Sequence, residues 1–154
     1  MDKPANRPKA LKSASEEHFD ALFFGWKMAE GLRSGIATKR LKAYADWFLK
    51  TYLIPHFEIE KKYVFPILGK NNVRVKKALA NHRRLLRLFK NTDEVFRSLN
   101  RIEDEIGRYI RFEERVLYEQ IQEKASPQQL KKIKEQHDKL KISDEEWEDR
   151  FWES

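Results

Sequence analysis

Four long stretches of the sequence place apolar residues at intervals of three and four, and this periodicity most constrains the fold. Such spacing lines one face of an α-helix. The stretches cover residues 13–33, 38–69, 71–90 and about 94–124, and short breaks separate them. Long helices joined by short connections pack as antiparallel neighbours. The sequence therefore predicts an all-α fold, an up-down-up-down four-helix bundle.

Residues that cap or break helices mark the boundaries of these stretches. Ser13 and Glu16 form a capping-box pattern at the first start, and Ser34-Gly35 closes that helix. Pro55 is expected to kink the second helix, because proline removes a backbone donor from the helix interior. Residues 1–12, which precede the first cap, are interpreted as a flexible N-terminal arm.

The C-terminal part of the chain begins with a strong restart signal. Ser126-Pro127 supplies a cap and a first-turn proline, and Ser143 with Glu146 offers a further cap before Trp147 and Phe151. These two aromatic residues are expected to pack onto the bundle, with a partner-binding anchor as the alternative. The predicted organisation is an arm over 1–12, a bundle over 13–125 and a helical appendage over 126–154.

Composition excludes several classes of site. The chain has 154 residues, enough for one domain with a core, and no cysteine, which removes disulfides and thiolate ligands. No apolar run approaches the length of a membrane span, and the N-terminus lacks the apolar core of a signal peptide. Glycine-rich phosphate loops are also missing from the sequence. We therefore expect a soluble, cytoplasmic protein with no membrane partner.

Each predicted long helix places a potential metal ligand on its otherwise apolar face. His56 and Glu60 stand four residues apart, which stacks an imidazole beside a carboxylate on one helix face. Imidazole and carboxylate suit iron, manganese and zinc. The fourth histidine, His137, lies in a lysine-rich segment and is expected to be solvated. The six candidate ligands are His18, His56, Glu60, His82, Tyr109 and Glu113.

Antiparallel geometry tests whether these residues meet, because residues equally far from a turn lie at the same height. By this count His18 is level with His56, and His56 with His82. Tyr109 is offset from His82 by roughly 10 Å at helical rise. Singly, each could be a hydrogen-bonded core residue, and Tyr109 could serve only in packing. Together, buried acids and imidazoles would be costly unless they were paired or bound to a shared cation.

These residues occur within segments that resemble the hemerythrin-like HHE cation-binding domain family. The segments that carry the resemblance are HFEIEKKYVFPIL in the second helix, NHRRLLRL in the third and YIRFEERVLYEQI in the fourth. A fourth segment, SEEHFDALFFGWKMAEGL, is similar to the first helix of the family. The resemblance covers most of residues 13–125 and implies a four-helix bundle around a di-iron centre.

The resemblance also implies roles for individual residues. His18 and His56 would serve one metal ion and His82 the other, while Glu60 and Glu113 would bridge the two. Tyr109 stands where members of the family usually have histidine, and a phenol ligand would favour the ferric state. Its role as a ligand or as a packing residue stays open at this point. Two iron ions are expected, although one ion, manganese or zinc also fits the donor set.

Three classes of function follow from these features. The first is a metal-binding protein that binds or senses dioxygen, nitric oxide or iron. The second is a di-iron oxidase or peroxidase, in which peroxide or dioxygen reacts at an open metal position. The third is a metal-free helical module whose basic face binds acidic partners, although no nucleic-acid motif accompanies that face and a nucleic-acid partner is not expected. The basic face comprises Lys70, Arg74, Lys76, Lys77, Arg83, Arg84, Arg87 and Lys90.

Overall fold

The computed structural model describes residues 9–140 and 147–153, and within these residues it contains helices and no strand. The all-α class predicted from the sequence is thus confirmed. No helix in the described part of the chain is both long enough and apolar enough to cross a membrane. The α-helices are α1 (Lys9–Arg33), α2 (Thr38–Phe48), α3 (Ile54–Ile59), α4 (Phe65–Leu68), α5 (Val73–Lys90), α6 (Val95–Phe112), α7 (Tyr118–Lys124) and α8 (Pro127–Lys139).

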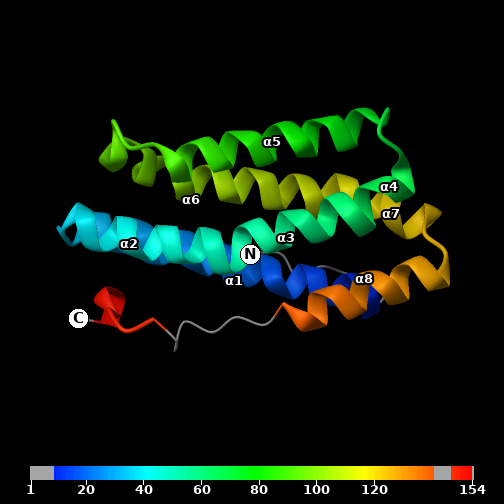
Figure 1. Ribbon diagram of the computed structural model, residues 1–154, viewed down its shortest axis with the longest axis horizontal. Helices are drawn as coiled ribbons and strands as arrows, with labels where there is room; N and C mark the ends of the chain where they lie inside the picture. The colour runs from blue at the N-terminus through cyan, green and yellow to red at the C-terminus, as the bar shows by residue number, and fades with distance from the viewer. Residues whose placement is uncertain (1–8, 141–146, 154) are drawn as a thin grey trace.

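Several of these helices follow one another without a break and form longer rods. One rod runs from α2 to α4 through the π-helical turns η1 (Leu49–Leu53) and η2 (Glu60–Val64), and another joins α6 to α7 through η3 (Glu113–Leu117). With α1 and α5 they make four rods that lie along the long axis of the molecule (Figure 1). Helix α6 packs against both α1 and α5, and α4 packs against α7. This arrangement fits the up-down-up-down bundle expected from the sequence.

Each π-helical turn is closed by a backbone hydrogen bond that spans five residues. The N–H of Ile54 donates to the carbonyl of Leu49, that of Phe65 to Glu60, and that of Tyr118 to Glu113. The first two turns directly precede Pro55 and Pro66, whose missing N–H groups interrupt the α-helical pattern. The irregularity expected at Pro55 therefore takes the form of a widened turn within a continuing rod. Two of the three turns begin at the candidate ligands Glu60 and Glu113.

Glycines and polar caps set the ends of the rods. Gly35 and Gly69 adopt positive φ angles of 74° and 91°, a region that glycine tolerates because it has no Cβ. Asn72 caps α5, since its side chain accepts hydrogen bonds from the N–H groups of Arg74 and Val75. These residues reverse the chain so that successive rods lie side by side.

The capping boxes expected from the sequence have different outcomes. Ser126 and Gln129 form both hydrogen bonds of the predicted box at the start of α8. Ser13 does not cap the first helix, because α1 already begins at Lys9 and passes through Ser13. The helix therefore extends into the region interpreted as an arm. The predicted cap at Ser143 and Glu146 lies outside the described residues.

Two apolar clusters fill the interior, one toward each end of the rods. The first is rich in aromatic residues and the second is mainly aliphatic. On each rod one candidate ligand falls between residues of the first cluster and residues of the second: these ligands are His18, Glu60, His82 and Glu113. The first cluster includes Phe24, Tyr44, Phe48, Leu85, Phe89, Ile106 and Ile110. The second includes Leu11, Val64, Val75, Ala78, Leu117, Ile121 and Ile133. The polar site thus occupies a layer between the two apolar clusters.

The C-terminal segment packs onto the rods, as the sequence predicted for its aromatic residues. Phe151 is buried, with its ring centroid 5.4 Å from that of Tyr44. Trp147 is partly buried, with centroids 5.4 Å from Trp47 and 5.8 Å from Tyr44. The segment lies near the end of the rods where α1 meets α2 (Figure 1).

Gly31 in α1 is expected to be required for this docking. A Cβ at this position would lie 2.5 Å from Cδ2 of Leu41 and 2.8 Å from Cε1 of Phe151. We expect Gly31→Ala to lower the free energy of unfolding by about 1–3 kcal/mol, because the buried neighbours must move apart. Urea titration measures the change. Gly107→Ala is the matched control, since its nearest neighbour is the flexible end of Arg111, and alanine there should leave stability equal or higher. Equal losses in both variants would contradict the steric explanation.

Lys27 is an unusual residue of the same region, because a lysine is rarely buried. Its side chain sits between two rings, with Nζ 4.5 Å from the centroid of Phe23 and 4.3 Å from that of Trp152. Burial, followed by the charge of Arg150, lowers the pKa of Lys27 to about 8, against the opposing effects of Asp20 and Glu153.

The lowered pKa of Lys27 makes a prediction about stability at alkaline pH. Between about pH 8 and the unfolded pKa of about 10.4, the unfolded chain binds more protons at this residue than the folded chain does. The contribution of Lys27 to stability therefore rises with pH in that interval. We expect the unfolding free energy of wild type to rise from pH 8 to pH 10 relative to that of Lys27→Met, whose side chain does not titrate. Parallel stability curves for the two proteins would contradict this assignment.

Candidate metal centre

The six candidate ligands are all buried, with 4% or less of each residue exposed. They reach the interior from every rod: His18 from α1, His56 from α3, Glu60 from η2, His82 from α5, Tyr109 from α6 and Glu113 from η3. The structure therefore brings together all six residues that the sequence singled out.

Two groups within this set could hold a metal ion. His18, His56 and Glu113 form one group, and Glu60, His82 and Glu113 form the other. Within each group, one nitrogen or oxygen atom from every residue lies within 4.8 Å of the others. Glu113 belongs to both groups, so the two potential metal positions are adjacent and share a carboxylate.

Glu60 is the meeting point of three residues from three rods. Its Oε1 lies 3.3 Å from Nε2 of His56 and 3.2 Å from Nε2 of His82. The hydroxyl of Tyr109 donates a hydrogen bond of 2.5 Å to the same oxygen and lies 2.6 Å from Nε2 of His82. Tyr109 and His82 thus meet despite the offset expected from counting residues. Helix α5 ends at Lys90, so the connection before α6 takes up the difference.

His18 is held on two sides in the other half of the site. Its Nε2 lies 3.5 Å from Oε2 of Glu113, while its Nδ1 lies 2.7 Å from Oε1 of Glu114. A carboxylate on the outer nitrogen commonly orients a histidine that binds metal through its inner nitrogen. The ring of Tyr118 stacks on His18 at a centroid distance of 5.4 Å, and its hydroxyl lies 3.5 Å from Nε2 of His18.

Glu114 and Tyr118 were not predicted from the sequence. Tyr118 follows Glu113 by five residues, a spacing that an ordinary α-helix does not place on one face. The π-helical turn η3 spans that interval and is closed by the hydrogen bond between their backbones. Glu114 had a weak signal, because adjacent glutamates can present one carboxylate to the site and the other to an outer histidine nitrogen.

Burial and mutual proximity set the protonation of the two central carboxyls. Burial opposes the charge of Glu60, but His56 and the hydrogen bonds from Glu113, His56 and His82 hold the pKa of Glu60 well below its usual range. Burial, followed by the charge of Glu60, raises the pKa of Glu113 well above its usual range. Proximity thus moves the pKa values of the two carboxyls in opposite directions, and a cation between them would favour the charged form of both.

Burial also favours the neutral forms of the His82 imidazole and the Tyr118 phenol, which lie beside these carboxyls. Burial lowers the pKa of His82, and the hydrogen bond and charge of Glu60 only partly oppose this effect. Burial and the charges of Glu113, Glu60 and Glu114 raise the pKa of Tyr118 well above its usual range. A neutral imidazole keeps the lone pair with which histidine binds a metal.

The donor set fits a metal ion. Oε2 of Glu60 and Nδ1 of His82 are buried, and neither makes a hydrogen bond among the described residues. Buried polar atoms without partners are rare, and an ion that does not appear in the coordinates is one established reason for them. Histidine and glutamate are also the ligand types that iron, manganese and zinc accept. These buried residues could therefore hold a metal ion.

A small cavity adjoins the site on the side of the aromatic cluster. It measures about 10 Å³ and is lined by His18, Tyr52, His56, Tyr109 and apolar residues of α1, α5 and α6. A space of this size holds about one water molecule. The site thus has room for a molecule of two or three atoms, while larger substrates would require the rods to separate.

His137 contradicts the prediction that it is solvated. The residue is 3% exposed, and its ring centroid lies 5.5 Å from that of His56. Helix α8 packs against α1, α3 and η2, and it turns Ile133 and His137, four residues apart, toward the interior. The lysines of this segment occupy the other faces of the helix. The spacing of Leu130, Ile133 and His137 was the available signal.

The basic face of α5 remains on the surface. Lys76, Arg83, Arg87 and Lys90 are exposed. Arg84 forms an ion pair of 2.9 Å with Glu105 of α6, so an acid of the neighbouring helix balances part of this face. The basic residues therefore lie on the outside of α5, away from the buried carboxylates.

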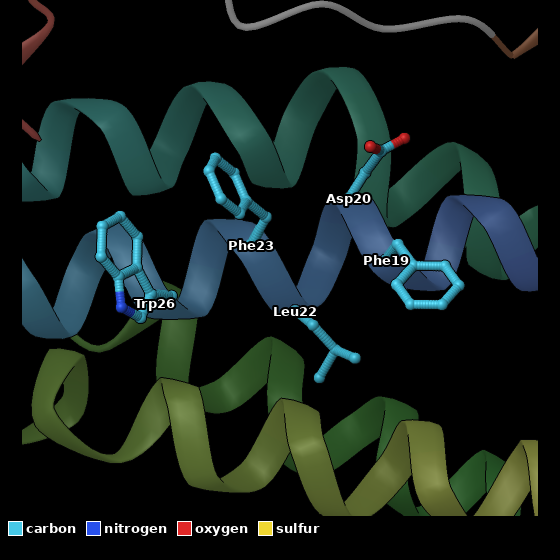
Figure 2. A pocket seen from close by; sticks show the side chains of 5 residues that line it. All are labelled: Phe19, Asp20, Leu22, Phe23 and Trp26. Atoms are coloured by element: carbon cyan, nitrogen blue, oxygen red, sulfur yellow. The ribbon is translucent and has the colours of Figure 1, made fainter. Parts of the chain in front are cut away.

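A second hollow lies on the outer surface of α1. Its volume is about 450 Å³, and Figure 2 shows its lining residues along a single helix. The lining offers one carboxylate and no imidazole, so it lacks the donor set found in the interior. The lining residues are Phe19, Asp20, Leu22, Phe23 and Trp26.

No protein-family model matches the chain, and comparisons with curated proteins and with solved structures find no match. The fold and the site define the class of protein by themselves. It is an all-helical protein whose buried histidine and glutamate side chains could hold a metal ion.

Proposed function

We propose that this protein is a hemerythrin-like four-helix bundle that holds two iron ions and binds or senses dioxygen, nitric oxide or iron. The observation that carries the proposal is the membership of Glu113 in both buried ligand groups. A carboxylate shared between two adjacent positions, one with two imidazoles and the other with one, is the arrangement expected for a pair of metal ions. The resemblance of the segments around His56, His82 and Glu113 to HHE domains supports the same assignment.

Each residue has a definite role in this proposal. His18 and His56 bind one ion through imidazole nitrogen, and His82 binds the other. Glu113, which belongs to both ligand groups, would bridge the two positions, and Glu60, predicted as a second bridge, would supply its carboxylate to the position of His82. Both would supply negative charge that offsets the charge of the cations. Glu114 fixes the orientation of His18 from outside, through the contact of 2.7 Å with Nδ1.

Tyr109 distinguishes this site from a purely imidazole and carboxylate centre. Its hydroxyl lies within hydrogen-bond distance of both Glu60 and His82, two residues of the group that would hold the second ion. We assign it as a phenolate ligand, which would favour ferric iron and disfavour reversible oxygen storage. When bound, iron would supply a redox-active Lewis acid that accepts small molecules at an open position.

The cavity beside His18, His56 and Tyr109 supports small ligands over larger substrates. Its volume of about 10 Å³ and its apolar wall suit dioxygen or nitric oxide. Sensing requires that a ligand bind reversibly without turnover. An oxidase or peroxidase would instead consume dioxygen or peroxide at the same position.

Elemental analysis of the aerobically purified protein, with anaerobic loading by ferrous iron, tests the proposal. We expect about two iron ions per chain. Loading should also raise the midpoint of thermal unfolding, because an ion that binds only the folded state stabilises it. Bound iron without turnover of peroxide or dioxygen would favour a sensor, and turnover would favour an enzyme. A protein that retains no iron, manganese or zinc after loading would refute the metal assignment.

A further inference from the structure

Helix α8 carries a buried imidazole to the edge of the candidate metal centre. His137 lies against His56, and the ring centroid of His56 is also 5.4 Å from that of His18. The three imidazoles therefore form a row that leads from the shared carboxylate Glu113 out to α8. His137 belongs to neither ligand group, but it contacts His56, which belongs to one of them.

The orientation of His56 indicates what this contact can do. Nε2 of His56 faces the carboxylates, at 3.3 Å from Oε1 of Glu60, and is the nitrogen placed to bind metal. The ring planes of His56 and His137 are inclined by 53°, so the two imidazoles meet at an angle and are not stacked face to face. Tyr52 stacks on a face of His56 at 5.5 Å and restricts rotation of the ring. His56 is thus held by one ring on its face and by another from α8.

We propose that His137 is a positioning residue for His56, and that docking of α8 thereby completes the half of the centre formed by His18, His56 and Glu113. His137 acts on His56 through contact between the two rings, whereas Glu114 acts on His18 through a contact at Nδ1. In both cases a residue outside the ligand groups restricts the orientation of a histidine that binds metal. The inference rests on the proposed metal-binding function. It adds that the C-terminal helix controls occupancy of one of the two positions.

Metal titration of the full chain with cobalt(II), monitored by its visible absorption, tests this inference. We expect wild type to bind two ions. His137→Ala removes the ring that packs against His56, so affinity for one of the two ions should fall by about 10–100-fold while the other is unchanged. His137→Phe keeps an aromatic ring in the same space without any nitrogen that could bind metal, and it should retain most of the wild-type affinity.

Two controls separate the contact of His137 with His56 from the general packing of α8 and from direct binding of metal by His137. Ile133→Val shortens a buried side chain of α8 one turn away, and it should lower stability slightly while leaving both affinities unchanged. The effect of His137→Ala should disappear in a His18→Ala background, where that half no longer binds, and persist in His82→Ala. Equal affinities in wild type and His137→Ala, or an equal loss of affinity in His137→Phe and His137→Ala, would overturn the inference. Failure of wild type itself to bind metal would instead refute the proposed function.

Discussion

Glu113→Gln is expected to abolish binding of both metal ions, whereas Glu60→Gln should release the ion on the His82 side first. Glu113 is the residue common to both ligand groups, and Glu60 belongs to one of them. Loading wild type at 1,000 times the dissociation constant should raise its unfolding free energy by about 4 kcal/mol for each ion bound, and Glu113→Gln should gain almost none of this. Equilibrium dialysis with elemental analysis, followed by urea titration, measures both effects.

Glutamine is nearly isosteric with glutamate, so the variant should fold. Helix content and the unfolding free energy of the metal-free variant should stay close to those of metal-free wild type. Asp104→Asn removes a carboxylate from an exposed position on α6 and should leave metal binding unchanged. Full occupancy in Glu113→Gln would show that this carboxylate does not bridge the ions.

Tyr109→Phe is expected to abolish a visible absorption band of the ferric protein. A phenolate bound to ferric iron absorbs visible light by charge transfer, and phenylalanine has no oxygen to bind. The hydroxyl of Tyr109 is already placed beside Glu60 and His82, where the second ion would lie. We also expect the reduction potential of the centre to rise, since an anionic oxygen ligand favours the ferric state. Absorption spectra and a redox titration of iron-loaded protein provide the measurements.

Tyr118→Phe serves as the matched control for this prediction. Tyr118 is a buried phenol beside His18, in the other half of the site. If the band arises from Tyr109, it should persist in Tyr118→Phe with little change in position. A wild-type ferric protein without the band would identify Tyr109 as a hydrogen-bond donor to Glu60 and not as a ligand.

The sequence was sufficient to predict the rods and the inward residues. Periodicity of apolar residues is set by helical geometry, so any polar residue in phase with it must point inward. His18, His56 and Glu60 were placed correctly for this reason. Counting from the turns also predicted that His18 and His56 would meet, because the connection between their helices is short.

Counting failed where connections or helical turns departed from regular geometry. Tyr109 reaches His82 because the chain between α5 and α6 takes up an offset that a residue count cannot anticipate. Glu114 and Tyr118 were missed because the π-helical turn η3 changes which residues face the site. His137 was missed because its segment is rich in lysine and was interpreted as solvated. One face of α8, with Ile133 and His137, nevertheless points inward.

The widened turn at Glu113 has a consequence for how this chain can vary. An α-helix advances by about 100° per residue, and the π-helical turn accommodates one residue more than an α-helical turn would. Deleting a single residue from Glu113–Leu117 would therefore restore an α-helical turn and leave the residues that follow in nearly the same rotational phase. Tyr118 and Ile121 would still face the interior. A deletion within the regular part of α6 would instead rotate the rest of the rod by about 100°, so the widened turn is the place in this rod where a change of one residue should be tolerated best.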